Sequence, residues 1–326
     1  MSAVVRTAIT GVGSYLPAEV LTNQDLAKIV DTSDQWIFDR TGIHERRRAA
    51  PDQAVSDLAV EAARQALAAA GRTAEDLDLI IVATTTPDLT FPATAAIVQR
   101  KLGAPMGIAF DVQAVCSGFI YALSIADGFI ARGAAKCGLV IGAEEMTRIL
   151  DWTDRTTCVL FGDGAGAVVV EPAVGQGTTA DRGLLSFALR CEGEKQDLLY
   201  VDGGPSTTGQ VGKLRMQGHQ VFRHAVVNIA EAIEAAADKA ALELDEIDWF
   251  VPHQANQRIL KGVADRLHIP EAKVVSTIAQ HANTSAASIP LALDTAIRDG
   301  RIKPGQLVLM EAMGGGLTWG ACLVRL

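Results

Sequence analysis

The chain alternates short apolar runs with longer stretches in which apolar residues recur every three or four positions. Short apolar runs are typical of buried strands, and the longer pattern is typical of amphipathic helices. In the first half the expected strands are Ala3–Gly11, Leu77–Thr85, Gly107–Val112, Gly138–Gly142 and Ala165–Glu171, and the expected helices are Val55–Ala70, Ala93–Leu102 and Ser117–Arg132. This alternation predicts a layered α/β fold.

The second half of the chain repeats the alternation. Its expected strands are Leu184–Cys191, Trp249–Val251, Gln306–Glu311 and Thr318–Leu326, its expected helices are Val221–Ala241, Ala255–Leu267 and Thr284–Arg298, and a short segment of the same kind lies at Lys273–Ser276. Between the halves, the segment that begins at Pro172 is rich in glycine and threonine, which favours a connection. We therefore expect two domains, residues 1–172 and 173–326.

A duplication relates the two halves. The helix ends at Gly133 and Gly300 are 167 residues apart (300 − 133 = 167), and the strands that follow match at an offset of 168 (307 − 139 = 168). Self-similarity at a near-constant offset indicates a repeated architecture. The offset of 167 applied to Cys116 gives Asn283 (283 − 116 = 167), so we expect these two residues to begin equivalent helices.

Cys116 lies where a short buried strand gives way to an apolar helix. At a helix N-terminus the unpaired N–H groups and the macrodipole favour a thiolate, so we expect the pKa of this thiol to lie below its ordinary value of about 8.5. A strand-to-helix turn can also expose a nucleophile above a sheet. The alternative is a buried cysteine that only fills space.

Three further features lie at the ends of predicted elements. His253 follows a short apolar strand, at the edge where open α/β sheets bind ligands, although histidines at such ends are often structural. Asn283 is either a functional amide or a helix cap. The segment Met313–Gly320 is rich in glycine, so its N–H groups could stabilise an oxyanion, or it could form a plain hairpin.

Composition and charge exclude several classes of function. The net charge of −9 and a pI near 5.2 argue against nucleic acid as a partner. The five cysteines are scattered without a C-x-x-C pair, so neither a disulfide framework nor a metal site is predicted. No signal-peptide pattern and no apolar run of about 18 residues is present, so we expect a cytoplasmic protein that does not enter a membrane.

Several motifs, in this order along the chain, resemble the β-ketoacyl-[acyl-carrier-protein] synthase III family. They are Asp31–Ile37, Arg40–Ile43, Asp111–Phe119, Leu160–Gly166, Pro252–Asn256, His281–Ser288 and Gly314–Gly320. The resemblance runs from about Thr10 to the C-terminus. It implies a thiolase-like, five-layer α/β/α/β/α fold with two duplicated halves, a homodimer, and no cofactor, since acyl-coenzyme A is a substrate.

The resemblance also implies a reaction. Cys116 would take the acyl group from an acyl-coenzyme A, with acetyl as the expected starter, and malonyl-acyl-carrier-protein would then lose carbon dioxide to form an enolate. His253 and Asn283 would stabilise the enolate oxygen, and the N–H groups of Cys116 and Gly316 would form the oxyanion hole.

Binding residues are implied in the same way. Trp36 and Arg155 would enclose the adenine of coenzyme A, with Thr32, Arg40 and Asn256 along the rest of it, although Arg155 could be an ordinary surface residue. Acyl carrier protein would dock on Gln254, Ala255, Asn256, Gln257 and Arg258, within a basic region that also contains Lys213, Arg215, Arg223, Lys261 and Arg266. A plain solvated charge run is the alternative for that region. Phe91 would reach the acyl pocket of the second subunit, or only pack in the interface.

Related activities are less well matched. Degradative thiolases need a second catalytic cysteine where this chain has Met313, and elongating synthases have a second histidine where it has Asn283. Chalcone-synthase-like enzymes are longer and end in a different glycine signature. A type III synthase that makes a polyketide or quinolone product stays open, and a non-enzymatic thiolase-like scaffold is a remote alternative. Ser117 and His219 depart from residues common in the family, with effects that the sequence leaves open.

Overall fold

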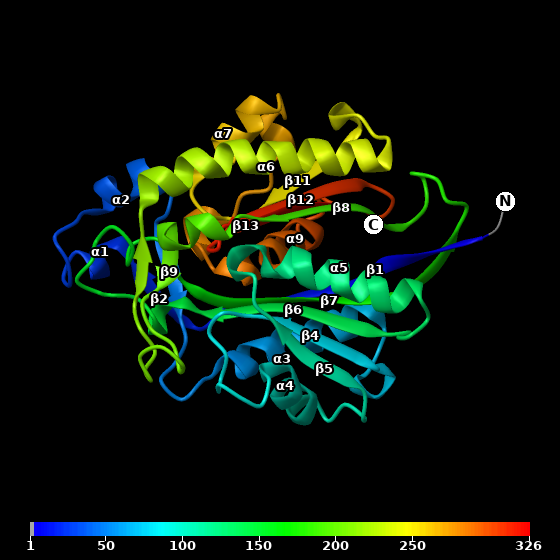
Figure 1. The fold of residues 1–326 in the computed structure, drawn as a ribbon, viewed down its shortest axis with the longest axis horizontal. Helices are drawn as coiled ribbons and strands as arrows, with labels where there is room; N and C mark the ends of the chain where they lie inside the picture. Colours follow the sequence, from blue (N-terminus) through cyan, green and yellow to red (C-terminus); the bar gives the residue numbers. More distant parts are fainter. Residues whose placement is uncertain (1–2) are drawn as a thin grey trace.

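The computed structural model describes residues 3–326 and contains two main sheets that enclose a layer of helices (Figure 1). The first sheet has the order β1 (Val4–Tyr15), β7 (Asp163–Gly175), β6 (Gly138–Glu145), β4 (Leu79–Ala83), β5 (Ile108–Val112). The second has the order β11 (Trp249–Pro252), β12 (Leu307–Gly314), β13 (Thr318–Arg325), β8 (Gly183–Cys191).

Helices lie between the sheets and on both outer faces (Figure 1). The inner layer is α5 (Gly118–Ala131) and α9 (Ser288–Arg298), one outer layer is α3 (Val55–Ala70) and α4 (Thr94–Leu102), and the other is α6 (Gly218–Ala240) and α7 (Gln257–Arg266). A helix packed on two sheets must be apolar over most of its surface, and the sequence of α5 is apolar in this way. The five-layer α/β/α/β/α architecture is confirmed.

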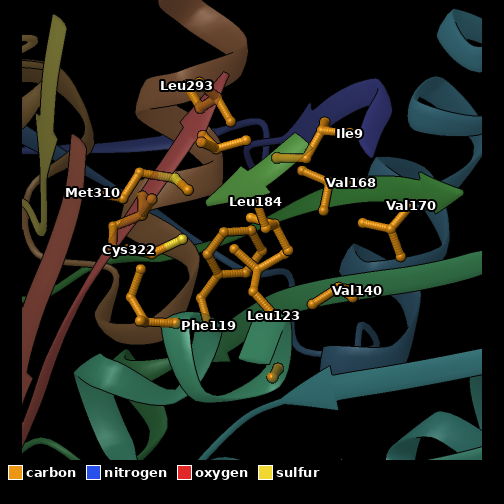
Figure 2. Close-up of a cluster of buried hydrophobic side chains, with 14 of the residues drawn as sticks. Ile9, Phe119, Leu123, Val140, Val168, Val170, Leu184, Leu293, Met310 and Cys322 are labelled. Carbon is orange, nitrogen blue, oxygen red and sulfur yellow. The ribbon is translucent and has the colours of Figure 1, made fainter. Parts of the chain in front are cut away.

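The largest cluster of buried hydrophobic side chains lies where the inner helices meet both sheets. Figure 2 shows Phe119 and Leu123 of α5 and Leu293 of α9 among side chains such as Val168 and Met310, which come from the two different sheets. Complete burial of each such side chain stabilises the fold by roughly 1.5–3 kcal/mol. The two halves are therefore joined through one continuous core.

The sheets repeat one another strand by strand. β4 pairs parallel with β6 as β11 pairs with β12, and the antiparallel pairs β6–β7 and β7–β1 recur as β12–β13 and β13–β8. The counterpart of β5 is reduced to a single parallel bridge between Phe250 and Val274, inside the expected segment Lys273–Ser276. The duplication expected from the sequence is present.

The register of the duplication differs from the expected offset. Asp78 bonds the backbone of Cys137 as Asp248 bonds that of Leu307, an offset of 170 residues (248 − 78 = 170). The same offset relates the short 3₁₀ helices η2 (Val115–Ser117) and η7 (Ser285–Ala287), which both begin with φ near +50°. The counterpart of Cys116 is therefore Ala286, and its equivalence with Asn283 is wrong.

The reason is a difference in helix length. α5 has 14 residues and α9 has 11, so an offset taken at the ends of these helices is three residues too short at their beginnings. Asn283 instead lies three residues before the position that matches Cys116.

Most expected elements are present, and α3 has the expected bounds. The expected boundary at residue 172 falls inside β7, which continues to Gly175 because its pairing with β1 extends from Ala165 to Gly175. Short elements were not expected: β2 (Glu19–Thr22), α1 (Asn23–Leu26), α2 (Asp34–Thr41), β3 (Glu45–Arg48), β9 (Leu199–Val201), β10 (Leu214–Met216) and α8 (Ile278–His281).

Among the helices of residues 3–326, none combines the length and the apolar character that crossing a bilayer requires. The expected cytoplasmic location stays a prediction, as does the expected absence of a cofactor.

Candidate active site

Cys116, His253 and Asn283 line one cavity of about 540 Å³. They come from η2, from the residue after β11, and from the loop before η7, which are far apart in the sequence. The cavity lies at the carboxyl ends of β5, β11 and β12, the edge at which open α/β sheets bind ligands. The fold therefore brings together these three side chains, which the sequence had singled out separately.

Cys116 is held by close packing between the two halves. A Cβ atom on Gly314 of β12 would lie 2.6 Å from the backbone nitrogen of Cys116, a distance that no real side chain tolerates. Glycine at this position therefore lets β12 approach η2. Gly314 of the glycine segment thus lies against the backbone of Cys116, while the expected role of Gly316 in an oxyanion hole stays a prediction.

The thiol of Cys116 is a neutral group in the free protein. Its exposed fraction is 3%, and burial raises its pKa to about 12. A hydrogen bond with Ser285 opposes this shift, while the nearby Glu144 carboxyl adds to it. The expectation of a lowered pKa is wrong, because desolvation at this depth outweighs the helix N-terminus.

Glu144 belongs to a hydrogen-bond network beneath the cysteine. Its carboxylate accepts hydrogen bonds from the Thr85 N–H (3.0 Å), the Thr86 hydroxyl (2.7 Å) and the Ser285 hydroxyl (3.0 Å). Ser285 thus connects the loop of Asn283 to β6 of the first half. The network fixes the geometry of the loop relative to the cysteine.

His253 is buried and neutral. Its backbone N–H donates to the carbonyl of Glu311 (2.8 Å), which continues the pairing of β11 with β12. Its ring Nδ1 lies 2.6 Å from the hydroxyl of Ser288. Burial lowers the pKa of the imidazole to about 3, so the ring enters the cavity with one proton.

Asn283 presents its amide nitrogen to the cavity. Its Oδ1 accepts the Ser285 N–H (2.9 Å), which fixes the orientation of the amide. Within residues 3–326, Nδ2 makes only a long contact of 3.5 Å with the carbonyl of Ala255, so it retains capacity to donate. His253 and Asn283 together supply neutral N–H donors suited to an oxygen that becomes negatively charged.

Trp36 lies at the mouth of the cavity. The Arg40 guanidinium lies 4.4 Å and that of Arg155 5.0 Å from the centre of its ring. A ring bound between Trp36 and Arg155 would need about 7 Å, twice a van der Waals contact of about 3.5 Å. Arg155, which bonds the carbonyl of Asp31 (2.8 Å), must therefore move before an adenine can enter. Thr32 has a buried hydroxyl without a partner in the described part of the chain.

One residue of the expected carrier-protein segment is wrongly assigned. Gln254 has an exposed fraction of 0%, and its side chain bonds the carbonyls of Pro252 and Val275 and the N–H of Thr277. A partner protein cannot reach it. Arg258 is exposed, Ala255 and Gln257 are half-buried, and Asn256 caps α7 by accepting the N–H of Arg258 (2.8 Å).

Only part of the expected basic region is unpaired. Lys261 pairs with Asp265 (3.3 Å), and Arg215 pairs with Asp151 and Asp202. Arg258 donates to the carbonyl of Asp39 (2.9 Å), and no carboxylate in the described part of the chain forms an ion pair with it.

Phe91 lies away from this cavity, with an exposed fraction of 82%. Its neighbours Leu89 and Thr90 line a second cavity of about 1010 Å³, which reaches Val115 beside the cysteine.

Ser117 and His219, which differ from residues common in the family, lie in different parts of the structure. His219, near the start of α6, lines the 540 Å³ cavity. The hydroxyl of Ser117 bonds the carbonyl of Ala114 (2.7 Å) and the hydroxyl of Thr318 (2.9 Å), so it supports η2.

Sequence reasoning did not single out Ser288 and Glu311. Ser288 contacts the ring of His253, and Glu311 lines the cavity with one carboxyl oxygen unpartnered within residues 3–326. Glu311 ends an expected strand, and a carboxyl group in an otherwise apolar buried strand was the signal that could have identified it.

Known proteins are similar over nearly the whole chain. Two family models match: "3-Oxoacyl-[acyl-carrier-protein (ACP)] synthase III" at residues 110–193, and the C-terminal model of the same name at residues 237–326. The β-ketoacyl-[acyl-carrier-protein] synthase III of Caulobacter vibrioides is 73% identical, covering 99% of this chain and 100% of that protein. That of Paramagnetospirillum magneticum is 60% identical with the same coverage.

Solved structures of proteins with the same family name are also similar to this chain. The crystal structure of 3-oxoacyl-[acyl-carrier-protein] synthase III from Aquifex aeolicus superimposes with a TM-score of 0.92 at 50% identity, covering 98% of this chain and 100% of that one.

Proposed function

The chain belongs to the β-ketoacyl-[acyl-carrier-protein] synthase III family, and we propose that the 540 Å³ cavity is its active site. The protein is a condensing acyltransferase that performs the initiating condensation of fatty acid synthesis, with an acyl-coenzyme A and an acyl carrier protein as substrates. The convergence of Cys116, His253 and Asn283 on one buried cavity is the observation that carries the site assignment.

In the first half-reaction the sulfur of Cys116 attacks the thioester carbonyl of an acyl-coenzyme A, with acetyl as the proposed starter. Because the free thiol is neutral, its proton leaves as the carbon–sulfur bond forms, and coenzyme A departs as a thiol. The N–H groups of Cys116 and Gly316 are the proposed donors to the oxyanion.

In the second half-reaction the malonyl-carrier-protein thioester loses carbon dioxide and becomes an enolate. The Nε2–H of His253 and the Nδ2–H of Asn283 donate to the enolate oxygen, and the enolate carbon attacks the acyl carbonyl on Cys116. The tetrahedral intermediate expels the cysteine thiolate, which regains one proton, and the β-ketoacyl group stays on the carrier protein.

The substrate contacts follow from the mouth of the cavity. Trp36, Arg40, Arg155, Thr32 and Asn256 are the proposed contacts of coenzyme A, with Arg155 moving to admit the adenine. Acyl carrier proteins are acidic, and Arg258 at the start of α7 is the proposed contact, together with Ala255 and Gln257.

We also propose that two copies of the chain form a homodimer. β5 is an edge strand, and Met106 just before it is 99% exposed. Exposed apolar residues beside an open sheet edge favour a second copy as the cover. Phe91 of each subunit would then close the cavity of about 1010 Å³ of the other subunit.

Relatives named as synthase III at 73% identity over the full chain do not favour the polyketide, quinolone or scaffold alternatives.

The test separates the half-reactions. After addition of acetyl-coenzyme A, intact-mass spectrometry should show one acetyl group on the native protein and on His253→Ala and Asn283→Ala, and none on Cys116→Ala. The His253 and Asn283 variants should fail to release labelled carbon dioxide from malonyl-carrier-protein. An adduct that persists in Cys116→Ala would overturn the assignment.

A further inference from the structure

The hydroxyl of Ser288 bonds two consecutive residues, His253 and Gln254, that directly follow β11. Ser288 is the first residue of α9, with an exposed fraction of 2%. Its Oγ accepts the backbone N–H of Gln254 (3.2 Å) and lies 2.6 Å from Nδ1 of His253. Within residues 3–326 these are the hydrogen bonds of this hydroxyl.

These partners assign the proton of the imidazole. A serine hydroxyl has one proton and two lone pairs, and the Gln254 contact uses one lone pair. If Nδ1 donated to the other lone pair, the buried hydroxyl proton would have no acceptor within residues 3–326, so the hydroxyl donates to Nδ1. A ring nitrogen that accepts a hydrogen bond is unprotonated, so the single proton of the neutral ring is on Nε2. Nε2 of His253, the nitrogen that faces the cavity, is then a hydrogen-bond donor.

The other half of the duplication shows that the fold does not require this hydroxyl. At the offset of 170 residues, Ser288 corresponds to Gly118 (288 − 118 = 170) and His253 to Ala83 (253 − 83 = 170). In that half a Cβ on Gly118 would lie 3.2 Å from the Cβ of Ala83, so the same helix start packs on the same strand end without a polar contact. The serine–histidine pair occurs only in the half that presents the donor.

We propose that Ser288 is a positioning residue that holds His253 in the Nε2–H tautomer, and so supports decarboxylation and condensation but not acylation of Cys116. The catalytic part of this statement rests on the proposed function. The opposite tautomer would place a lone pair toward the enolate oxygen, and two negative centres would then repel one another.

The first measurement concerns the tautomer and needs no turnover. Long-range ¹H–¹⁵N spectra of ¹⁵N-histidine-labelled protein, with His253→Ala used to identify the signal, should show Nε2–H in the native protein and a mixture of tautomers in Ser288→Ala. A protonated Nδ1 in the native protein would overturn the inference even if Ser288→Ala did not fold. Failure of the proposed function would leave this measurement untouched.

The second measurement separates the half-reactions. Ser288→Ala should acylate Cys116 at the native rate and should condense roughly 10- to 100-fold more slowly, a typical effect of losing a residue that orients a functional histidine. Ser288→Thr, which keeps the hydroxyl, should recover part of the rate. Thr295→Val removes a different hydroxyl bond from α9 (to Leu291, 2.9 Å) and should change neither step.

Two outcomes would contradict the proposal. One is condensation by Ser288→Ala within about twofold of the native rate. The other is an equal loss of acylation and condensation, which would indicate a general structural role for Ser288.

Discussion

Burial, more than charged partners, sets the protonation of the side chains in the active-site cavity. It lowers the pKa of His253 to about 3, raises that of Cys116 to about 12, and raises that of Glu311 to about 8. Each shift favours the uncharged form. The cavity therefore offers neutral donors to the substrate, and charge develops there only during the reaction.

Glu311 gives a prediction on stability. Its folded pKa of about 8 exceeds the ordinary 4.5, so its contribution to stability is fully present below pH 4.5 and is lost as the pH rises through 8. At about 1.4 kcal/mol for each pKa unit, the loss reaches several kcal/mol. Glu311→Gln cannot ionise and should raise the melting temperature at about pH 9, with a smaller gain at about pH 5.

Thermal unfolding at both pH values measures this effect. Glu234→Gln, at an exposed position of α6, is the matched control and should leave the melting temperature unchanged at both values. A gain for Glu311→Gln that does not grow with pH would show that Glu311 is not the titrating group.

At the scale of single residues, the sequence predicts which side chains are functional candidates better than it predicts their burial and their contacts. Cys116, His253 and Asn283 stand at element ends, which local pattern reveals. Gln254 is buried and bonds Val275 and Thr277, and burial in the folded structure sets the pKa of the Cys116 thiol. Neither environment can be read from the local sequence. Ser288 resembles an ordinary serine at a helix start, and only its distance from His253 distinguishes it.

The short helix η2 is the element that sets the position of the nucleophile. It is held between β12 and α5, and Gly314 allows the approach. Gly314→Ala should shift η2 and lower the rate of Cys116 acylation about 100-fold, because a displacement of about 1 Å costs that much in a reacting pair. Stopped acylation reactions followed by intact-mass spectrometry give the rate.

Gly128 provides the matched control within α5. A Cβ there meets nothing within 4 Å, so Gly128→Ala should keep the native rate and stabilise the helix by about 0.5–1 kcal/mol. Native acylation in Gly314→Ala would show that η2 tolerates the displacement.

Among the larger elements, helices and strands with strong apolar patterns were predicted well, and α3 agrees at both ends. The short elements around the cavity mouth were not expected. α2 and β3 are rich in charged residues and lack a long apolar run, so tertiary contacts rather than local pattern determine them.

At the scale of the whole molecule, the open edge of β5 and the exposed Phe91 lead to a prediction on assembly. Phe91→Asp would remove the apolar contact of Phe91 with the second subunit and would bury a charged carboxylate in the interface. The variant should therefore shift the protein from dimer toward monomer. Sedimentation velocity across a concentration series measures the shift. Val174→Asp, at an exposed apolar position on the terminal part of β7, is the control and should leave the assembly unchanged. A native protein that sediments as a monomer would contradict the homodimer.

The duplicated halves were also visible in the sequence, but their register was not. The offset was read where α5 and α9 end, and the three-residue difference between these helices moved the match of Cys116 onto Asn283. The five layers came from the family resemblance, because the alternation of strands and helices alone does not fix how many sheets form.

The close approach of η2 to Gly314 has a counterpart in the other half. A Cβ on Gly142 of β6 would lie 2.2 Å from the carbonyl oxygen of Ala286 in η7. Each sheet thus has a glycine, which lacks a side chain, at the point where the short 3₁₀ helix of the opposite half packs against it. The two glycines are not equivalent positions of the duplication, since Gly142 matches Ala312 (142 + 170 = 312), but replacement of either one would displace the turn of the other half. One copy has evolved the thiol and the other the amide and imidazole, within a shared constraint that keeps these groups facing one another.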